Sequence, residues 1–282
     1  MRVAVTGANG MVGKAVVKDL IANKYDVCSI VHNRDDTSPF EQIEIDIRNY
    51  DDVYKAMKDC QALIHLAAIP SPRPGKNHIV FETNAVGTYN VLLAAGLHGI
   101  KRVAVASSDS ILGLTYSINK PTPEYLPVDD KHPLKPDDTY GLSKIVSEEI
   151  AEAMSLRFKM SIATLRISHV MTEDKYQKDQ FKKWQQDPEE GPWNLWSYID
   201  NRDAARVFRL AIENDLKGHE IFFITAEDTR SLIKSDKLIE KYFPKADIIT
   251  DFKGYETLEN IEKAKKLLNF VPKYSWRNIL KI

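Results

Sequence analysis

A tyrosine and a lysine four residues apart are the first pair of side chains in this sequence that could do acid and base chemistry. Tyr140 and Lys144 stand in the run Tyr140-Gly141-Leu142-Ser143-Lys144, inside a segment of helical period. The four-residue offset puts both side chains on one face of a helix. A free tyrosine ionises near pH ~10, but a neighbouring ammonium favours the phenolate and lowers the pKa toward the range for proton exchange with an alcohol. Because this spacing also arises by chance, the pair needs support from other residues.

Hydroxyl groups at the end of a predicted strand supply that support. Ala106-Ser107-Ser108-Asp109-Ser110 follows directly after Val103-Ala104-Val105. The carboxyl edge of a parallel sheet is where doubly wound folds bind their ligands. A serine at this edge can hold a reacting oxygen and orient it toward the tyrosine. A helix cap or a polar turn would explain the same residues.

A glycine-rich turn near the amino terminus predicts a dinucleotide site. The run Thr6-Gly7-Ala8-Asn9-Gly10-Met11-Val12-Gly13 lies between the first predicted strand and the first predicted helix. Glycines there let the backbone turn sharply and approach a pyrophosphate, and the unpaired amides at the helix start attract its negative charge. The spacing is Gly-x-x-Gly-x-x-Gly, so Gly7, Asn9, Gly10, Met11 and Gly13 are candidate cofactor contacts. A tight strand-to-helix turn without a ligand is the alternative.

The end of the second strand bears on which dinucleotide is expected. Residues 27–31 lead into His32-Asn33-Arg34, with no acidic residue where a ribose 2'-hydroxyl would be held. The planar fork of Arg34, beside His32, could accept a 2'-phosphate, so NADP is slightly favoured over NAD. Asp35 and Asp36 follow closely and could reverse the preference. A solvated turn in which Arg34 makes no cofactor contact fits the sequence as well.

Two further strand ends are candidate cofactor contacts. Asp46 and Ile47 end the third strand, where they could touch an adenine, and Leu66-Ala67-Ala68 ends the fourth, where small residues would let a ring lie against the backbone. Taken alone, each fits ordinary strand-end packing.

The elements that must position these residues alternate along the chain. Short apolar runs rich in β-branched residues are expected as strands near 2–6, 26–31, 42–46, 61–66, 101–107 and 161–167, and segments of helical period near 11–23, 50–58, 79–98 and 139–158. This alternation predicts an α/β fold with a parallel sheet. We expect a dinucleotide-binding domain over 1–168 and a smaller substrate-binding subdomain over 169–282, packed on the first, with part of 200–225 returning to the sheet.

Composition narrows the classes of protein that remain. The 282 residues, 43% of them hydrophobic, can bury a large core, and the formal net charge of -1 offers no basic field for nucleic acid or an anionic membrane. No metal site is expected. The two cysteines, Cys28 and Cys60, lie in apolar surroundings and suit a reducing compartment. With neither a secretory signal pattern nor eighteen consecutive apolar residues, the sequence predicts a cytoplasmic protein.

Taken together, these motifs resemble the NAD-dependent epimerase/dehydratase family of the extended short-chain dehydrogenases. The resemblance covers roughly residues 1–215 and includes the stretch Asn84-Ala85-Val86-Gly87-Thr88-Tyr89-Asn90-Val91. It implies a Rossmann-type doubly wound sheet and a homodimer formed through two long helices. It further implies that Ser108 orients the substrate, that Tyr140 is the general acid/base, and that Lys144 lowers the pKa of the tyrosine and holds the nicotinamide ribose. Asn84 would support the site or only the helix backbone.

Departures from the family pattern leave the substrate open. The dehydratase Thr-Asp-Glu reads Ser108-Asp109-Ser110, which argues against dehydration, and a histidine, His169, replaces the usual asparagine after residues 165–168. The chain is short, like the uronate dehydrogenases that oxidise free sugar acids. Residues 193–198 could stack a sugar or close a core. Asp200 could simply cap a helix, and Arg202 and Arg206 could bind an anionic group or remain solvated.

Three functions are therefore compared. The first is an epimerase or oxidoreductase acting on a hydroxyl of a sugar or sugar nucleotide. The second is a one-way dehydrogenase of a free sugar acid or a reductase of a small carbonyl compound. The third is a dinucleotide sensor without catalysis, which the combination of Ser108, Tyr140 and Lys144 disfavours.

Overall fold

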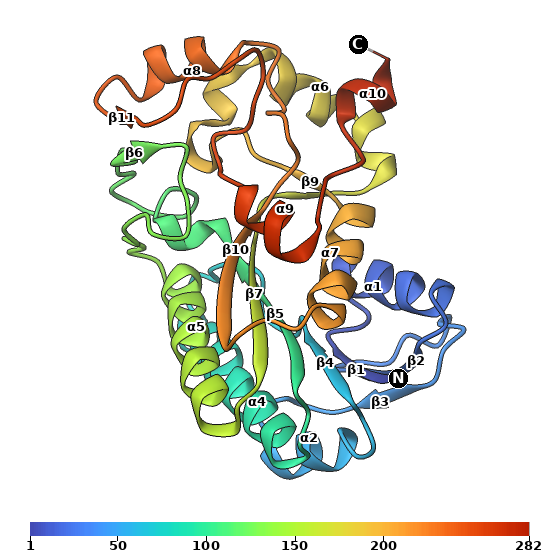
Figure 1. Ribbon diagram of the computed structural model, residues 1–282. Helices are drawn as coiled ribbons and strands as arrows, with labels where there is room; N and C mark the ends of the chain where they lie inside the picture. Colours follow the sequence, from blue (N-terminus) through green and yellow to red (C-terminus); the bar gives the residue numbers. More distant parts are fainter. Residues whose placement is uncertain (282) are drawn as a thin grey trace.

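The computed structural model describes residues 1–281 and is built on one seven-stranded parallel sheet (Figure 1). The strands lie in the order β10-β7-β5-β4-β1-β2-β3. Their bounds are β1 Arg2–Thr6, β2 Asp26–Val31, β3 Gln42–Glu44, β4 Ala62–His65, β5 Arg102–Ser108, β7 Ser161–Ile167 and β10 His219–Ile224. The order reverses between β1 and β4, and doubly wound sheets open a ligand crevice at such a point, outside the carboxyl ends of the strands.

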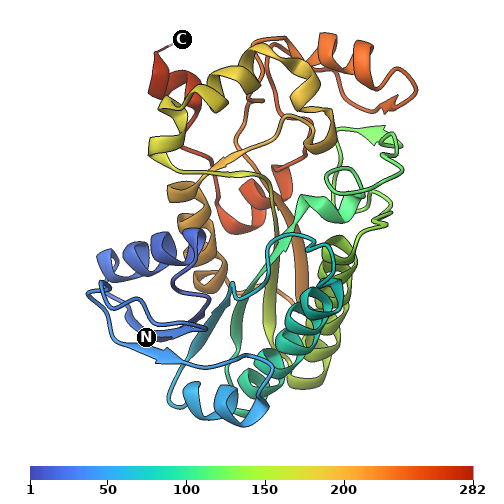
Figure 2. The same ribbon diagram turned by 180° about the vertical axis from the view of Figure 1, so that it is seen from behind.

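Helices cover both faces of this sheet (Figures 1 and 2). One face carries α1 (Met11–Ala22) and α7 (Asn201–Glu213), and the other carries α2 (Tyr50–Ala56), α4 (Gly87–Leu97) and α5 (Thr139–Phe158). Val3 and Val5 pack toward the first layer and Ala4, between them, toward the second, because successive strand side chains alternate. Burial on both faces explains the continuous apolar runs of these strands and confirms the expected α/β class.

The helix expected over 79–98 is interrupted. It divides into α3 (Asn77–Phe81), a π-helical turn (Glu82–Val86) and α4. Asn84, within the π turn, accepts a hydrogen bond from the Ile69 amide (2.8 Å) and donates to the Ile69 carbonyl (3.1 Å). The helical period of the sequence did not predict this π turn, which inserts one residue into the helix. The elements expected at 42–46 and 50–58 also end early, at Glu44 and Ala56.

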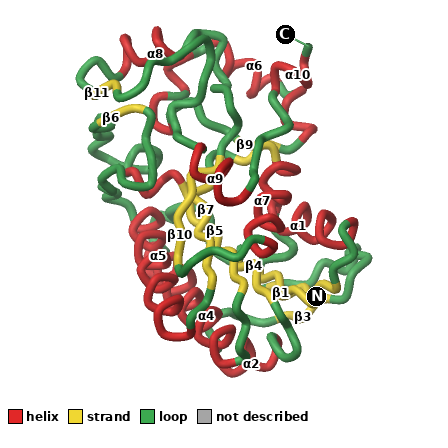
Figure 3. Tube along the Cα trace, in the orientation of Figure 1, coloured by secondary structure: helices red, strands yellow, loops and turns green. Residues whose placement is uncertain are grey.

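The remaining segments form a second, smaller layer at the carboxyl edge of the sheet, with long loops between short elements (Figure 3). It has apolar clusters of its own, which include Trp196 and Tyr198, so residues 193–198 contribute mainly to a core. The chain returns from this layer to the sheet through α7 and β10. The layer contains β6 Tyr125–Leu126, β8 Val170–Met171, β9 Ile199–Asp200, β11 Asp247–Ile248, α6 Asp179–Gln186, α8 Ser235–Tyr242, α10 Trp276–Leu280 and 3-10 turns at Asp109–Leu112, Glu173–Gln177, Pro188–Glu190 and Pro192–Asn194. The helix α9 (Glu262–Leu268) returns to the main sheet and packs beside α7 and β10.

Three properties of residues 1–281 bear on the functional class. No helix in this range has both the length and the apolar character needed to cross a membrane. No three His, Cys, Asp or Glu side chains in it gather as a metal-binding group. Cys28 and Cys60 are both buried and both free thiols, as their apolar surroundings predicted.

Candidate active site

Two adjoining cavities open at the carboxyl edge of the sheet. One, of about 670 Å³, lies over the ends of β1, β2 and β4, and the other, of about 350 Å³, lies over the ends of β5 and β7. Leu66, Ala68 and Pro70 line both cavities, so the segment after β4 forms a wall that they share. This is the crevice that the reversal of strand order predicts.

The glycine turn brings the backbone close to the larger cavity. Gly7 has a φ of +71°, and a Cβ there would lie 2.7 Å from the Ala67 nitrogen. A Cβ at Gly13 would lie 2.2 Å from the Gly7 carbonyl oxygen, so α1 can begin this close to β1 only with glycine at that position. Gly10 caps α1 without a side-chain hydrogen bond, which leaves the amides of the first turn facing outward. Such a turn fits a dinucleotide diphosphate.

Most of the predicted cofactor contacts line a cavity, and three do not. The larger cavity is lined by Gly7, Asn9, Gly10, His32, Asp46, Ile47, Leu66, Ala67 and Ala68, and the smaller by Met11, Leu66, Ala68, Ser108, Tyr140 and Lys144. Gly13 contributes close packing instead. Arg34 extends outward near Glu44, at 3.8 Å, which matches the alternative of a solvated turn. The Asn84 side-chain amide forms hydrogen bonds with the Ile69 backbone and the Ser143 hydroxyl (3.0 Å). It therefore supports the residues around the site and does not line either cavity.

Asp46 and Asn9 are fixed by neighbours that the sequence did not point to. Arg48 binds both carboxylate oxygens of Asp46, and these hydrogen bonds lower the pKa of Asp46 below its usual range. Gln42 exchanges hydrogen bonds with the Asn9 amide at 2.7 and 3.1 Å. The larger cavity therefore has a rigid polar rim on the side of β3.

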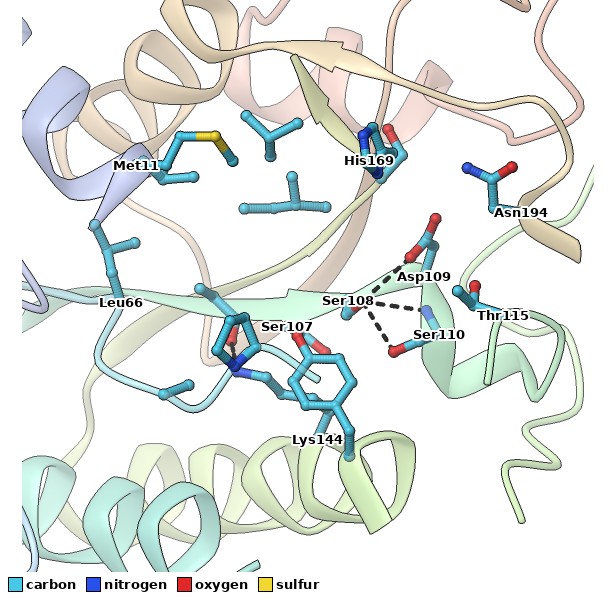
Figure 4. Close-up of a pocket in the computed structure, with 18 of the residues that line it drawn as sticks. Met11, Leu66, Ser107, Ser108, Asp109, Ser110, Thr115, Lys144, His169 and Asn194 are labelled. Atoms are coloured by element: carbon cyan, nitrogen blue, oxygen red, sulfur yellow. Dashed lines mark hydrogen bonds between the residues drawn. The ribbon is translucent and has the colours of Figure 1, made fainter. Parts of the chain in front are cut away.

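Tyr140 and Lys144 lie in the smaller cavity because of how α5 begins. The Asp138 carboxylate caps the helix by accepting a hydrogen bond from the Gly141 amide (2.9 Å), which starts α5 one residue before the tyrosine. The Lys144 ammonium donates to the Ala106 carbonyl of β5 (2.8 Å) and lies 5.8 Å from the Tyr140 ring centre. Lys144, Ser107, Ser108 and Asp109 converge on the same space (Figure 4).

The electrostatics of this pair differ from the expectation that Lys144 lowers the pKa of the tyrosine. Burial raises the pKa of Tyr140 above its ordinary value, although the Ser108 hydroxyl opposes the shift. Burial also lowers the pKa of Lys144 to about 8, against the opposing effect of Glu148. Desolvation is the largest cause of this shift in the Tyr140 pKa, and Tyr116, Asp109 and Asp138 add to it.

A buried ion pair beneath the site was missed by the sequence analysis. Glu148, one helical turn beyond Lys144, accepts two hydrogen bonds from Arg166 of β7 (2.8 and 3.1 Å) and one from the Ser107 hydroxyl (2.6 Å). The side chain of Arg166 is only 2% exposed and that of Glu148 only 5%. An arginine inside an otherwise apolar strand was the one available signal, because such a charge needs a buried partner.

The wall opposite Tyr140 comes from the smaller layer. Thr115, His169, Lys175 and Asn194 line it, together with Asp109, the first residue after β5. Figure 4 shows Thr115, His169, Asn194 and Asp109 around the cavity. Arg202 and Arg206 do not take part, since they pair with Asp200 and Asp203, and Asp200 also caps α7. Asp200 is therefore a helix cap, one of the expected alternatives, and the two arginines form local ion pairs instead of remaining solvated.

Comparison with known proteins identifies the class to which this fold and site belong. The model of the NAD dependent epimerase/dehydratase family matches residues 3–224. The protein is an NAD(P)-dependent enzyme of the extended short-chain dehydrogenase/reductase type. The chain belongs to the NAD dependent epimerase/dehydratase family, and its cofactor is NAD or NADP.

Similar proteins include both dehydrogenases and epimerases. The L-arabinose 1-dehydrogenase (NAD(P)(+)) of Haloferax volcanii is 29% identical over 82% of this chain and 91% of its own. A uronate dehydrogenase of Pseudomonas syringae pv. tomato is 26% identical over 79% and 73%. A putative UDP-glucose 4-epimerase of Methanocaldococcus jannaschii is 35% identical over 61% and 56%. A solved short-chain dehydrogenase/reductase superfamily protein from Agrobacterium tumefaciens with bound NAD superposes with a TM-score of 0.77 at 22% identity, covering 100% of this chain and 95% of its own.

Proposed function

We propose that the protein is a one-way dehydrogenase of a free sugar, the second of the three functions compared above, broadened from sugar acids to free sugars. The observation that carries this choice is the size of the smaller cavity. About 350 Å³ lies at the lower end of the roughly 300–1,000 Å³ typical of small-molecule sites, and it must also admit the nicotinamide ring. The volume suits one sugar ring better than a sugar nucleotide.

The arginines of the smaller layer support the same choice. A sugar nucleotide carries a diphosphate, and arginine forks are among the groups that proteins use to bind one. Arg202 and Arg206 are held by Asp200 and Asp203, and Arg230 is buried with its guanidinium on the Glu190 carbonyl. None of these three lines the cavity. The similarity to the L-arabinose 1-dehydrogenase, which extends over 91% of that chain, agrees with a free sugar.

The chain's own residues would act on the substrate hydroxyl as follows. Tyr140, once ionised, takes the proton of that hydroxyl, and Ser108 holds the same oxygen at the end of β5. Lys144 is anchored on the Ala106 carbonyl, so its charge stays beside the phenol, and it would also hold the ribose of the cofactor. The glycine turn and the first-turn amides of α1 would bind the diphosphate of NAD or NADP, whose nicotinamide supplies the hydride acceptor. Residues 169–198 and 225–281 would form the substrate-binding unit.

A substrate panel tests this function. The purified protein is incubated with NAD or NADP and free aldoses, uronates or UDP-sugars, while nicotinamide absorbance and product stereochemistry are followed together. We expect stoichiometric reduction of the cofactor with a free sugar. An isomerised UDP-sugar without a change in absorbance would contradict the dehydrogenase and favour the epimerase.

A preference for NADP over NAD follows from the end of β2. Val31 is apolar and buried there, and the next acid along the chain, Asp35, is bound to Lys14 (2.7 Å) and Thr37 outside the larger cavity. We expect NADPH to bind about tenfold more tightly than NADH, the size of one hydrogen bond to a charged group. Fluorescence titration measures both affinities.

Two variants sharpen the cofactor test. Val31→Asp places a carboxylate at the ribose and should reverse the preference, because the acid repels a 2'-phosphate and binds a 2'-hydroxyl. Asp35→Asn should leave the ratio unchanged, since Asp35 faces Lys14. Tighter binding of NADH by the unaltered protein would contradict the prediction.

We also propose a homodimer through α4 and α5. Tyr89 and Leu97 of α4 and Leu142 and Leu156 of α5 are large apolar residues left exposed on two helices that pack side by side (Figure 2). Leu156 is 72% exposed. Exposed apolar groups on neighbouring helices are typical of interfaces. A two-fold axis would pair the helices as a four-helix core.

Light scattering on a sizing column tests the dimer. The chain should elute with twice its monomer mass, and the double variant Leu97→Glu/Leu156→Glu should elute as a monomer, because four charges would be buried across the axis. Leu232→Glu is the matched control, as it places the same charge on an exposed leucine outside these helices. A monomer mass for the unaltered chain would rule the interface out.

A further inference from the structure

The Ser108 hydroxyl is already engaged within its own turn. It donates a hydrogen bond to the Asp109 carboxylate (3.1 Å) and accepts from the Ser110 amide (3.2 Å) and the Ser110 hydroxyl (2.9 Å) (Figure 4). These bonds occupy its single hydrogen and both of its lone pairs.

This arrangement conflicts with holding a substrate oxygen. A serine that orients a carbinol or carbonyl oxygen must donate its hydrogen to that oxygen. As long as the Asp109 carboxylate accepts the hydrogen, Ser108 has none to donate. A protonated Asp109 removes the conflict, because a carboxylic acid can itself donate and no longer competes as an anion for the serine hydrogen.

The surroundings of Asp109 favour the protonated form. Its side chain is 8% exposed, and burial raises its pKa to about 7, although Arg230 and the donors of its own turn oppose the shift. Glu259 is a second buried carboxyl group that interacts with Asp109. It is 1% exposed, neither of its carboxylate oxygens has a hydrogen-bond partner within the described residues, and burial raises its pKa well above the usual range. The titratable groups that face Asp109 or share its cavity are Arg230, Glu259, Tyr116, Tyr140, Lys144, His169 and Lys175.

We propose that Asp109 is a positioning residue that controls the direction of the Ser108 hydroxyl. When Asp109 carries a proton, Ser108 turns its hydrogen into the cavity and holds the substrate oxygen. When Asp109 is ionised, it withdraws that hydrogen. The proposal rests on the proposed function only in that Ser108 contacts the reacting oxygen.

A direct test needs no substrate. The titration midpoint of Asp109 is measured by ¹³C NMR on protein labelled at the aspartate carboxyl carbon, with the signal assigned by its loss in Asp109→Asn. We expect a midpoint near neutral pH. Ser108→Ala should raise it by about one pH unit, because the carboxylate loses a donor. Ser110→Ala, the same change in the same turn, should move it much less, since that hydroxyl donates to Ser108.

Two outcomes of this titration would overturn the proposal. A midpoint below pH 5 would mean that Asp109 is always ionised under working conditions. An unchanged midpoint in Ser108→Ala would mean that the serine does not donate to Asp109. Both results are independent of catalysis, so they are distinct from a failure of the substrate panel, which would remove the proposed function and leave the hydrogen-bond switch to be judged by NMR.

A kinetic test uses the sugar that the panel identifies. For the unaltered enzyme, kcat/KM should rise with pH up to the midpoint of Asp109 and then level off, because the loss of the protonated acid offsets the further ionisation of Tyr140. Asp109→Asn should remove this break, so that kcat/KM keeps rising, because an amide does not titrate. A merely structural role for Asp109 would leave the break in place. Glu259→Gln is the matched control, a buried carboxyl converted to an amide, and should retain the break. Persistence of the break in Asp109→Asn, or its loss in Glu259→Gln, would refute the assignment.

Discussion

Replacing Tyr140 by Phe should reduce kcat by roughly 10²–10⁴-fold, the usual contribution of a positioned acid or base. The change removes one oxygen from a buried ring that otherwise keeps its contact with Tyr116, so the fold should persist. Cofactor affinity, measured by fluorescence titration, should stay near that of the unaltered protein, because the glycine turn and Lys144 are intact.

Tyr116→Phe is the matched control for this experiment. Its ring meets that of Tyr140 edge-on at 5.8 Å and lines the same cavity, so the same oxygen is removed one ring away. We expect a much smaller loss of kcat. A Tyr140→Phe variant with normal turnover would show that another group transfers the proton.

The pH dependence of sugar oxidation should follow from the same phenol. Burial raises the pKa of Tyr140, so the protonated form prevails at neutral pH and only the ionised form can take a proton from the substrate. The rate should therefore rise with pH on the acidic side of its profile. This rise should be absent in the residual activity of Tyr140→Phe.

Replacing Glu148 by Gln should destabilise the protein by about 3–5 kcal/mol, the usual effect of removing one partner of a buried ion pair. The pair is fully enclosed, and Ser107 would lose its charged acceptor as well. The free energy of unfolding, measured by denaturant titration, should fall by this amount without a large change in slope.

Two further variants separate charge burial from other effects. Glu149→Gln makes the same change one residue later on an exposed side chain and should stay within about 0.5 kcal/mol of the unaltered protein. The double variant Glu148→Met/Arg166→Met removes both charges and should recover most of the loss, because buried pairs often stabilise no more than apolar residues of similar volume. A single variant as stable as the unaltered protein would mean that Arg166 finds another partner.

Local signals in the sequence predicted the parts of the site that depend on backbone geometry. The three glycines, the four-residue offset of Tyr140 and Lys144, and the position of Ser108 after a strand each reflect one element and its end. All these residues lie at the shared cavities or pack directly beneath them. The alternation of strands and helices along the chain predicted the parallel sheet for the same reason. A strand that is buried on both faces is apolar throughout, and this can be seen in its own sequence.

Features that depend on contacts between distant elements could not be predicted from the sequence. Arg34 was considered for the cofactor but extends toward Glu44, and Asn84 was counted as a cofactor contact but binds Ile69 and Ser143. The expected lowering of the Tyr140 pKa failed because the depth of burial cannot be judged from spacing. The pairing of Glu148 with Arg166 joins a helix to a strand and leaves no periodic trace in either.

The pairing of β6 with β11 has a consequence for exchanging substrate specificity between relatives. Tyr125 and Leu126 pair with Asp247 and Ile248, and the Val128 amide donates to the Leu258 carbonyl. A segment from the amino-terminal half of the chain is thus part of the smaller layer, which is otherwise built mainly from the carboxyl-terminal half. In a chimera joined at residue 168, β6 and β11 would come from different parent proteins, and their pairing and the burial of Leu126 would be at risk. A transplant that takes residues 114–136 together with the carboxyl-terminal portion would keep both strands from one parent.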